Sequence, residues 1–188
     1  MTASETRSKH YTALAIALHW VLGLMLVVQF IFGSYMADLP FSPQQLKLYN
    51  YHKWTGITLL VLSLVRLIWR MSHPAPPLAE NIVKIMPRWQ RIVRETTHIA
   101  IYALFFIVPL TGWAYSSAAG FPIVVFGVLP LPDWVPADKA LAEIIKPWHQ
   151  LMAWTLAALV FLHVAAAIKH QFVDKDGLIS RMLPSFGR

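Results

Sequence analysis

The sequence of 188 residues contains no cysteine. This absence excludes disulfides, iron–sulfur clusters and thiolate metal sites, so a metal centre in this chain must use other ligands. Charged residues are also scarce: they make up 13% of the chain, whereas 57% is hydrophobic. A soluble domain is closer to one quarter charged. The composition therefore predicts an integral membrane protein, and the length fits a single domain, residues 1–188.

Four apolar runs are each long enough to cross a bilayer, which takes about 20 helical residues. They cover residues 11–33, 51–70, 96–115 and 148–170. The sequence thus predicts an all-α fold, a transmembrane four-helix bundle. We expect a short loop over residues 34–49 and a longer one over residues 116–146 that folds over the helix ends.

The net charge of +7 does not indicate nucleic-acid binding, because the basic residues flank the apolar runs instead of forming one patch. With four spans, both termini lie on one side of the lipid bilayer. Of the 16 lysines and arginines, only Lys47, Lys53, Lys139 and Lys146 fall on the opposite side. The positive-inside rule therefore predicts that both termini are cytoplasmic.

Three histidines lie along one stripe of the last apolar run, at His149, His163 and His170. Helical residues advance by about 100° each, so spacings of fourteen and seven return close to the starting direction. His149 and His163 are separated by about 21 Å along the helix axis at a rise of about 1.5 Å per residue. Ionisable groups at membrane depth are costly and usually functional, so this stripe is a candidate site.

Histidines on other spans match the depths of two of these residues. Because successive spans alternate in direction, His52 shares an outer level with His149, and His19 shares an inner level with His163. Two imidazoles that face each other at one depth can supply both axial ligands of a haem iron. The sequence therefore predicts two haem b groups with these four histidines as iron ligands. The alternative is a set of hydrogen-bonded core imidazoles.

Other residues near these levels allow two interpretations each. Gly23 and Gly56 follow His19 and His52 by one turn, and could leave room for a flat porphyrin or simply help helices pack. His98 and His170 form a third pair at the inner interface, where they could bind a quinone carbonyl or reach towards water. Arg66 could pair with a haem propionate or anchor its helix end.

Six motifs together resemble the prokaryotic cytochrome b561 family of four-helix dihaem membrane proteins. The resemblance runs from about residue 10 to Leu183. The motifs are ALHW (17–20), YHKWTGI (51–57), VRLIWR (65–70), THIAIYAL (97–104), PWHQ (147–150) and LHVAAAIKHQFVDKDG (162–177).

The resemblance implies two b-type haems, with outer ligands His52 and His149 and inner ligands His19 and His163, in a bacterial inner membrane. It also implies electron exchange with ubiquinone, with His170 near the quinone. A characterised relative oxidises superoxide at the outer face. The connection before the last helix is longer here than in that type, so the superoxide activity and the status of the chain as an oxidoreductase stay open.

We therefore expect a dihaem electron carrier between a periplasmic donor, for example superoxide, and the quinone pool. Lys53 and Lys146, beside the outer histidines, could attract an anion. One alternative is a haem-bearing membrane anchor for a dehydrogenase or hydrogenase subunit. Another is a metal-ion transporter lined by histidines, although the four apolar runs contain no Asp or Glu.

Overall fold

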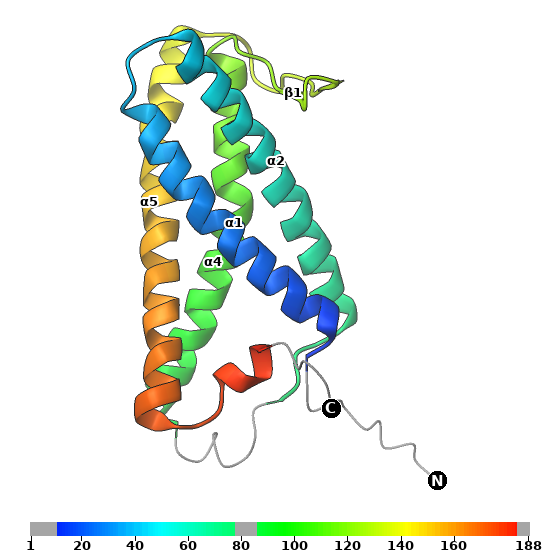
Figure 1. Ribbon diagram of the computed structural model, residues 1–188, viewed down its shortest axis with the longest axis vertical. Helices are drawn as coiled ribbons and strands as arrows, with labels where there is room; N and C mark the ends of the chain where they lie inside the picture. The colour runs from blue at the N-terminus through cyan, green and yellow to red at the C-terminus, as the bar shows by residue number, and fades with distance from the viewer. Residues whose placement is uncertain (1–10, 78–85, 184–188) are drawn as a thin grey trace.

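The computed structural model describes residues 11–77 and 86–183, and Figure 1 shows them as an elongated helical bundle. Four long helices run alternately up and down: α1 (Ala13–Ala37), α2 (Pro43–Ser72), α4 (Arg88–Ala118) and α5 (Lys139–Lys169). Each is long and apolar enough to cross a membrane. The predicted four-helix transmembrane fold is confirmed, and the chain is a multi-pass membrane protein.

Polar side chains cap three of these helices at their first turns. Thr12 accepts a hydrogen bond from the Ala15 amide at 3.3 Å ahead of α1, and Ser42 accepts one from the Gln45 amide at 3.2 Å ahead of α2. Asp138 accepts the amide of Ala140 at 2.8 Å at the start of α5. These oxygens satisfy amides that have no partner within the helix, and so fix where each helix begins.

The helices extend further than the apolar runs, so two of the predicted loops are shorter than expected. Helix α2 begins at Pro43, inside the stretch 34–49, because Ser42 caps it and proline suits a first turn. Helix α5 begins at Lys139, inside the stretch 116–146, and continues through Pro147. A proline inside a helix removes one hydrogen bond and favours a kink, but it does not always end the helix.

Apolar side chains cover the outside of the bundle as well as its interior. Leu22 and Leu156 are each 2% exposed between the helices, whereas Leu24 is 69% and Phe161 72% exposed on the surface. An apolar surface of this extent would be unstable in water, but it is what the acyl chains of a bilayer require.

Short elements lie at both ends of the bundle. Between α4 and α5, strands β1 (Val124–Val125) and β2 (Leu129–Pro130) form an antiparallel hairpin that extends sideways past α2 in Figure 1. After α5 come a π-helical turn, η1 (His170–Asp174), and a 3₁₀ helix, η2 (Ile179–Met182). Helix η2 folds back under the bundle, where the Trp20 indole donates to the Met182 carbonyl at 2.6 Å.

Candidate functional site

Two histidines face each other between α2 and α5 at the end of the bundle that carries the hairpin. The ring centroids of His52 and His149 are 6.4 Å apart, and the ring planes are nearly perpendicular at 87°. The predicted outer pair is therefore close in space, although its members are 97 positions apart in the sequence by their numbers.

Each outer histidine lies against a glycine of a neighbouring helix. A Cβ on Gly33 of α1 would be 2.8 Å from His52 Cε1, and a Cβ on Gly112 of α4 would be 3.0 Å from His149 Cε1. Even an alanine at either position would press on the imidazole. The two glycines therefore allow the histidine rings to lie against the backbones of α1 and α4.

The hydrogen bonds around the outer pair fix one ring more firmly than the other. His149 Nδ1 is 3.1 Å from the Val108 carbonyl oxygen, so this nitrogen carries the proton, and a neutral ring then has its lone pair on Nε2. Within the described part of the chain, His52 Nδ1 is buried without a hydrogen-bond partner. The amide of Gln29 donates to the His52 carbonyl at 2.7 Å and ties α1 to α2 at this level.

The second pair lies towards the other end of the bundle. The ring centroids of His19 on α1 and His163 on α5 are 6.2 Å apart, with an interplanar angle of 78°. His163 follows His149 by fourteen residues of one continuous helix, which corresponds to about 21 Å of rise. The predicted pairing by depth thus agrees with the positions of all four histidines.

Arg66 of α2 points into the region of the inner pair. It donates to the Ala15 carbonyl at 2.8 Å and to the Tyr102 hydroxyl at 3.1 Å, and its Nη2 is 3.4 Å from His19 Nδ1. A guanidinium is always charged, and carbonyl and hydroxyl oxygens compensate it here. The arginine therefore joins α1, α2 and α4 beside a histidine, and it does more than anchor a helix end.

The two histidines of the predicted third pair have different partners. His98 of α4 lies against His163, with ring centroids 5.1 Å apart. His170, after the last turn of α5, has its Nδ1 2.6 Å from an oxygen of Asp176 and 3.0 Å from one of Asp174. His98 thus belongs to the inner histidine cluster, whereas His170 belongs to a separate carboxylate cluster.

The two facing pairs fit the requirements of haem. With bonds of about 2 Å between a metal and each imidazole nitrogen, two ligating rings have centroids roughly 6 Å apart, and both pairs meet this spacing. His52 Nδ1, which is buried without a hydrogen-bond partner among the described residues, also suits a metal ligand. Gly33 and Gly112 contribute by letting the two outer rings lie against the backbones of α1 and α4. No atom of the described residues lies within 4 Å of the Cβ position of Gly23, so open space lies beside this glycine and no neighbouring helix packs against it.

Sequence reasoning missed four residues that shape these sites: Gly33, Gly112, Gln29 and Tyr102. Counting residues from the connecting loops does not reveal the first two. Gly33 lies four residues before the end of α1, whereas His52 lies nine after the start of α2. Gly112 lies six residues before the end of α4, and His149 lies ten after the start of α5. These contacts depend on the rotation and tilt of the helices.

The fold and the facing histidines together are those of a helical membrane cytochrome. The family model described as prokaryotic cytochrome b561 matches residues 10–185, and the chain belongs to this family. It is therefore a b-type haem protein of electron transport.

Three relatives illustrate the range of the family. Cytochrome b561 homolog 2 of Escherichia coli (strain K12) is 30% identical, over 93% of this chain and 92% of the relative. The probable superoxide oxidase CybB of Yersinia pestis is 29% identical, over 94% and 97%. The probable Ni/Fe-hydrogenase B-type cytochrome subunit of Azotobacter vinelandii is 25% identical, over 88% and 82%.

Proposed function

We propose that the chain carries electrons across the bacterial inner membrane between a periplasmic donor and ubiquinone, using two b-type haems. The two facing histidine pairs, 6.4 and 6.2 Å between ring centroids, are the observation that carries this proposal. His52 and His149 would hold one haem, and His19 and His163 the other. Each haem, when bound, supplies a one-electron redox centre.

The chain's own residues would hold and insulate these centres. The Val108 carbonyl accepts a hydrogen bond from Nδ1 of His149 and so fixes the orientation of the ring. Support of this type commonly tunes metal ligands. The positive charge of Arg66 near His19 would favour the reduced, more negative state of a nearby centre. The apolar helices exclude water from both levels.

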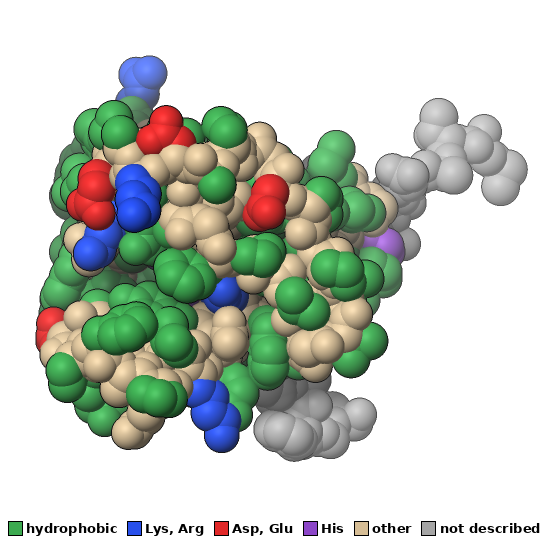
Figure 2. Space-filling model, turned by 90° about the horizontal axis from the view of Figure 1, so that it is seen from above, with side chains coloured by type: hydrophobic (Ala, Val, Ile, Leu, Met, Phe, Trp, Pro, Cys, Tyr) green, Lys and Arg blue, Asp and Glu red, His purple; other side chains and the backbone are tan. Residues whose placement is uncertain are grey.

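Superoxide is one candidate donor, because a relative that is 29% identical bears the name of a probable superoxide oxidase. The outer end itself is of mixed character: Figure 2, a view from above in Figure 1, has apolar side chains interspersed with a few basic and acidic ones. The amine of Lys53 donates to the Phe121 carbonyl at 3.3 Å, so this lysine also supports the loop. In Figure 2 the basic side chains do not form one continuous patch of the kind that steers an anion strongly.

Anaerobic stopped-flow reduction of the oxidised protein tests the proposed function. Superoxide, ascorbate and a ubiquinol analogue are mixed with the protein in turn while the haem absorbance is followed. We expect quinol to react and at least one outer donor to reduce the same protein. If superoxide reacts equally fast after Lys53 and Lys146 become alanine, those lysines have no steering role. Failure of every donor and of quinol would refute the electron-carrier function.

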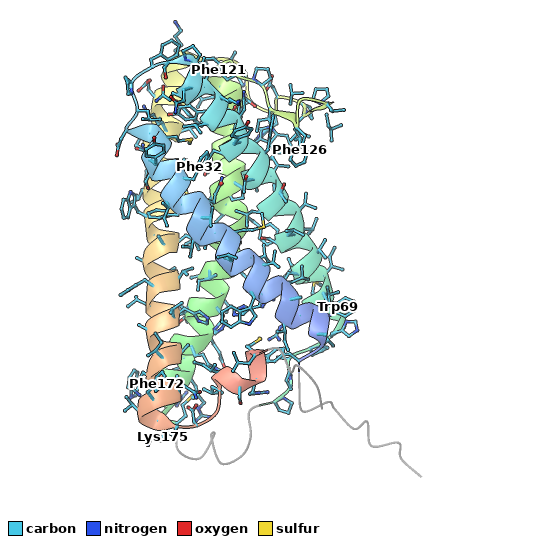
Figure 3. The ribbon with its side chains drawn as sticks, in the orientation of Figure 1. Phe32, Trp69, Phe121, Phe126, Phe172 and Lys175 are labelled. Carbon is cyan, nitrogen blue, oxygen red and sulfur yellow. The ribbon has the colours of Figure 1, made fainter. Side chains whose placement is uncertain are left out.

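The quinone would be bound near His170, at the C-terminal end of α5. The carboxylate of Asp176 accepts from His170 and also from the Leu178 amide at 3.0 Å, so the imidazole is held on an ordered turn. A hollow of about 340 Å³ opens beside this turn between Gln171, Phe172, Lys175 and Gly177. Figure 3 labels Phe172 and Lys175 at this end of the bundle. An imidazole oriented by a carboxylate can transfer protons to a quinone oxygen.

Replacing His170 by alanine is expected to slow quinol-driven reduction by about 100-fold, a typical loss for a proton-transfer group. The haem content should stay unchanged, because His170 lies apart from both facing pairs. Asp176→Asn should have a smaller effect and should shift the pH dependence of the rate. The measurement is stopped-flow reduction by a ubiquinol analogue across pH. His73→Ala, just after the C-terminal end of α2, is the control. An unchanged rate in His170→Ala would place the quinone elsewhere.

We also propose that both termini lie in the cytoplasm. The basic residues concentrate at the end of the bundle where α1 begins and α5 ends. Among the described residues they include Arg70, Arg94, Lys169 and Arg181. Fusing reporters that are active on only one side of the membrane to residues 1 and 188 tests this. Activity of a periplasmic reporter at either end would reverse the proposed direction of electron flow.

The second candidate function is that of a haem-bearing anchor for a soluble redox subunit. It is favoured by the relative named as a hydrogenase B-type cytochrome subunit. Purification from native membranes under mild detergent conditions distinguishes the two. A stoichiometric soluble oxidoreductase that co-purifies would support the anchor function. A haem protein that purifies without such a subunit and still reacts with quinol would support the independent carrier.

A further inference from the structure

The β-hairpin between α4 and α5 belongs to a stretch without any charged side chain. From Gly120 to Pro132 the sequence reads GFPIVVFGVLPLP. A two-stranded ribbon that packs one face on a protein and turns the other to water normally alternates apolar and polar residues. This ribbon has apolar residues on both faces.

Among the described residues, side chains cover only one face of the hairpin. Ile123 and Val125 point towards the bundle and are 2% and 8% exposed. The other side chains of the hairpin and its turn are exposed, with values of 66% for Phe126, 83% for Val128 and 59% for Leu129. An apolar edge of this kind invites aggregation if it stays in water.

Side chains of α2 hold the hairpin in a fixed position beside that helix. The Trp54 indole donates to the Val124 carbonyl at 2.6 Å, and Lys53 donates to the Phe121 carbonyl. The ring of Phe126 is 5.6 Å from that of Trp54. The hairpin therefore has a defined direction, and Figures 1 and 3 show that it extends sideways from the bundle, with Phe126 away from the bundle axis.

The turn itself retains an aromatic residue at a backbone position that suits other residues better. Phe126 has φ of 52° and Gly127 has φ of 75°, while the Val128 amide donates to the Val125 carbonyl at 3.0 Å. Two successive positive φ values characterise a type I′ turn, whose first position is usually asparagine, aspartate or glycine. Strain of this kind is commonly retained where the side chain has a function.

The hairpin starts at the level of aromatic residues that mark a membrane–water interface. Tyr51 and Trp54 lie together near the outer end of α2, with ring centroids 5.4 Å apart, and Lys47 lies over the Tyr51 ring. Tryptophan and tyrosine concentrate at this level, where their apolar rings and polar tips are both satisfied. The exposed apolar face of the hairpin is thus continuous with the lipid-facing surface of the helices.

We propose that the tip of the hairpin, Phe126 to Leu129, inserts into the outer phospholipid leaflet beside α2. The ligand is the acyl region just below the headgroups, at a depth of about 5–10 Å, as for other interfacial apolar anchors. The strand hydrogen bonds satisfy part of the backbone, and Phe126 provides the aromatic anchor. This inference does not depend on haem ligation or on the identity of the donor.

The absence of cysteine allows a direct test with single-cysteine variants of the full chain. An environment-sensitive fluorophore is attached to Val128→Cys in the haem-loaded protein, reconstituted in nanodiscs. Matched labels at Leu24→Cys, exposed on the middle of α1, and Gln44→Cys, at the outer end of α2, provide lipid and water references. Lipids with a nitroxide either near the headgroup or near the chain end then report the depth of each label.

The label at Val128 is expected to emit at shorter wavelength than the label at Gln44. It should lose more fluorescence to the shallow nitroxide than to the deep one, whereas the label at Leu24 should show the opposite order. Emission and quenching that match Gln44 would overturn the proposal. A short-wavelength emission without quenching by either nitroxide would also overturn it, because the tip would then be covered by protein, such as a second copy of the chain.

A second substitution tests the role assigned to Phe126. Phe126→Asn suits the positive φ of the turn, so the fold should be maintained, as judged by an unchanged Tm. The same change removes the anchor, and the label at Val128 should lose most of its quenching by the shallow nitroxide. Unchanged quenching in this variant would show that Phe126 is not the inserted group.

Discussion

Replacing His149 by alanine is expected to remove one b-type haem from the protein and leave the other in place. His52 would then be the one imidazole left at the outer level, and a single ring cannot provide both axial ligands. The inner pair is about 21 Å away along α5 and shares no ligand with the outer pair. The haem content per chain should therefore fall by half, measured as the pyridine haemochrome against protein concentration.

The control for this substitution is His73→Ala. His73 stacks on Trp69 at the end of α2, with ring centroids 3.9 Å apart, and lies outside both pairs. This variant should keep its full haem content. A His149→Ala protein that retains all of its haem in a six-coordinate state would contradict the proposed ligand set. Loss of all haem would leave the ligands unassigned, and in that case His163→Ala should be compared for the folded fraction.

Replacing Gly33 by alanine is expected to disturb the outer site through a single methyl group. The new Cβ would be 2.8 Å from His52 Cε1, a distance that real side chains avoid, so the imidazole must turn or α1 must move away. Overpacking of this kind typically costs about 1–3 kcal/mol. We expect a lower Tm and a partial loss of the haem held by His52. Thermal unfolding followed at the haem absorbance band measures both.

Gly23→Ala provides the matched control, because it adds the same methyl group to the same helix. Its Cβ position is at the level of the inner pair and has no atom of the described residues within 4 Å, so the haem held by His52 should be retained. Gly112→Ala, 3.0 Å from His149 Cε1, should resemble Gly33→Ala with a smaller effect. Equal behaviour of the Gly33 and Gly23 variants would show that the glycine beside His52 does not support the ring.

The arrangement of the helices could be predicted from the sequence because the bilayer imposes a simple physical rule. Backbone groups in a lipid environment must be satisfied within a helix, so long apolar runs become spans of known rise and alternating direction. Depth along each span then follows from residue number. This is why the sequence alone pairs His52 with His149 and His19 with His163.

The rest depends on how helices are rotated and where they end, which composition does not determine. The start of α5 at Lys139 depends on the carboxylate of Asp138, and the apolar run that begins at residue 148 does not reveal it. The contact between His98 and His163 depends on the rotation of α4 about its axis. Several rotations of an apolar helix place equally apolar residues against lipid, so the pattern does not select one of them.

The contrast between the two histidine levels suggests how their properties would differ. The outer rings lie against glycines, and His149 also contacts a backbone carbonyl, whereas the inner rings lie beside Arg66 and a third histidine. The positive charge at the inner level would raise the midpoint potential of a redox centre held there. Such a difference would favour electron flow from the outer side towards the quinone side.

The most direct test of the account is the number and coordination of the haems in the purified wild-type protein. The pyridine haemochrome gives the haem content per chain, and electron paramagnetic resonance of the oxidised protein gives the spin state. We predict two b-type haems for each polypeptide, both low-spin with two imidazole ligands. A single haem per chain, or a high-spin centre with an open axial position, would contradict the pairing of histidines on which the proposed electron path depends.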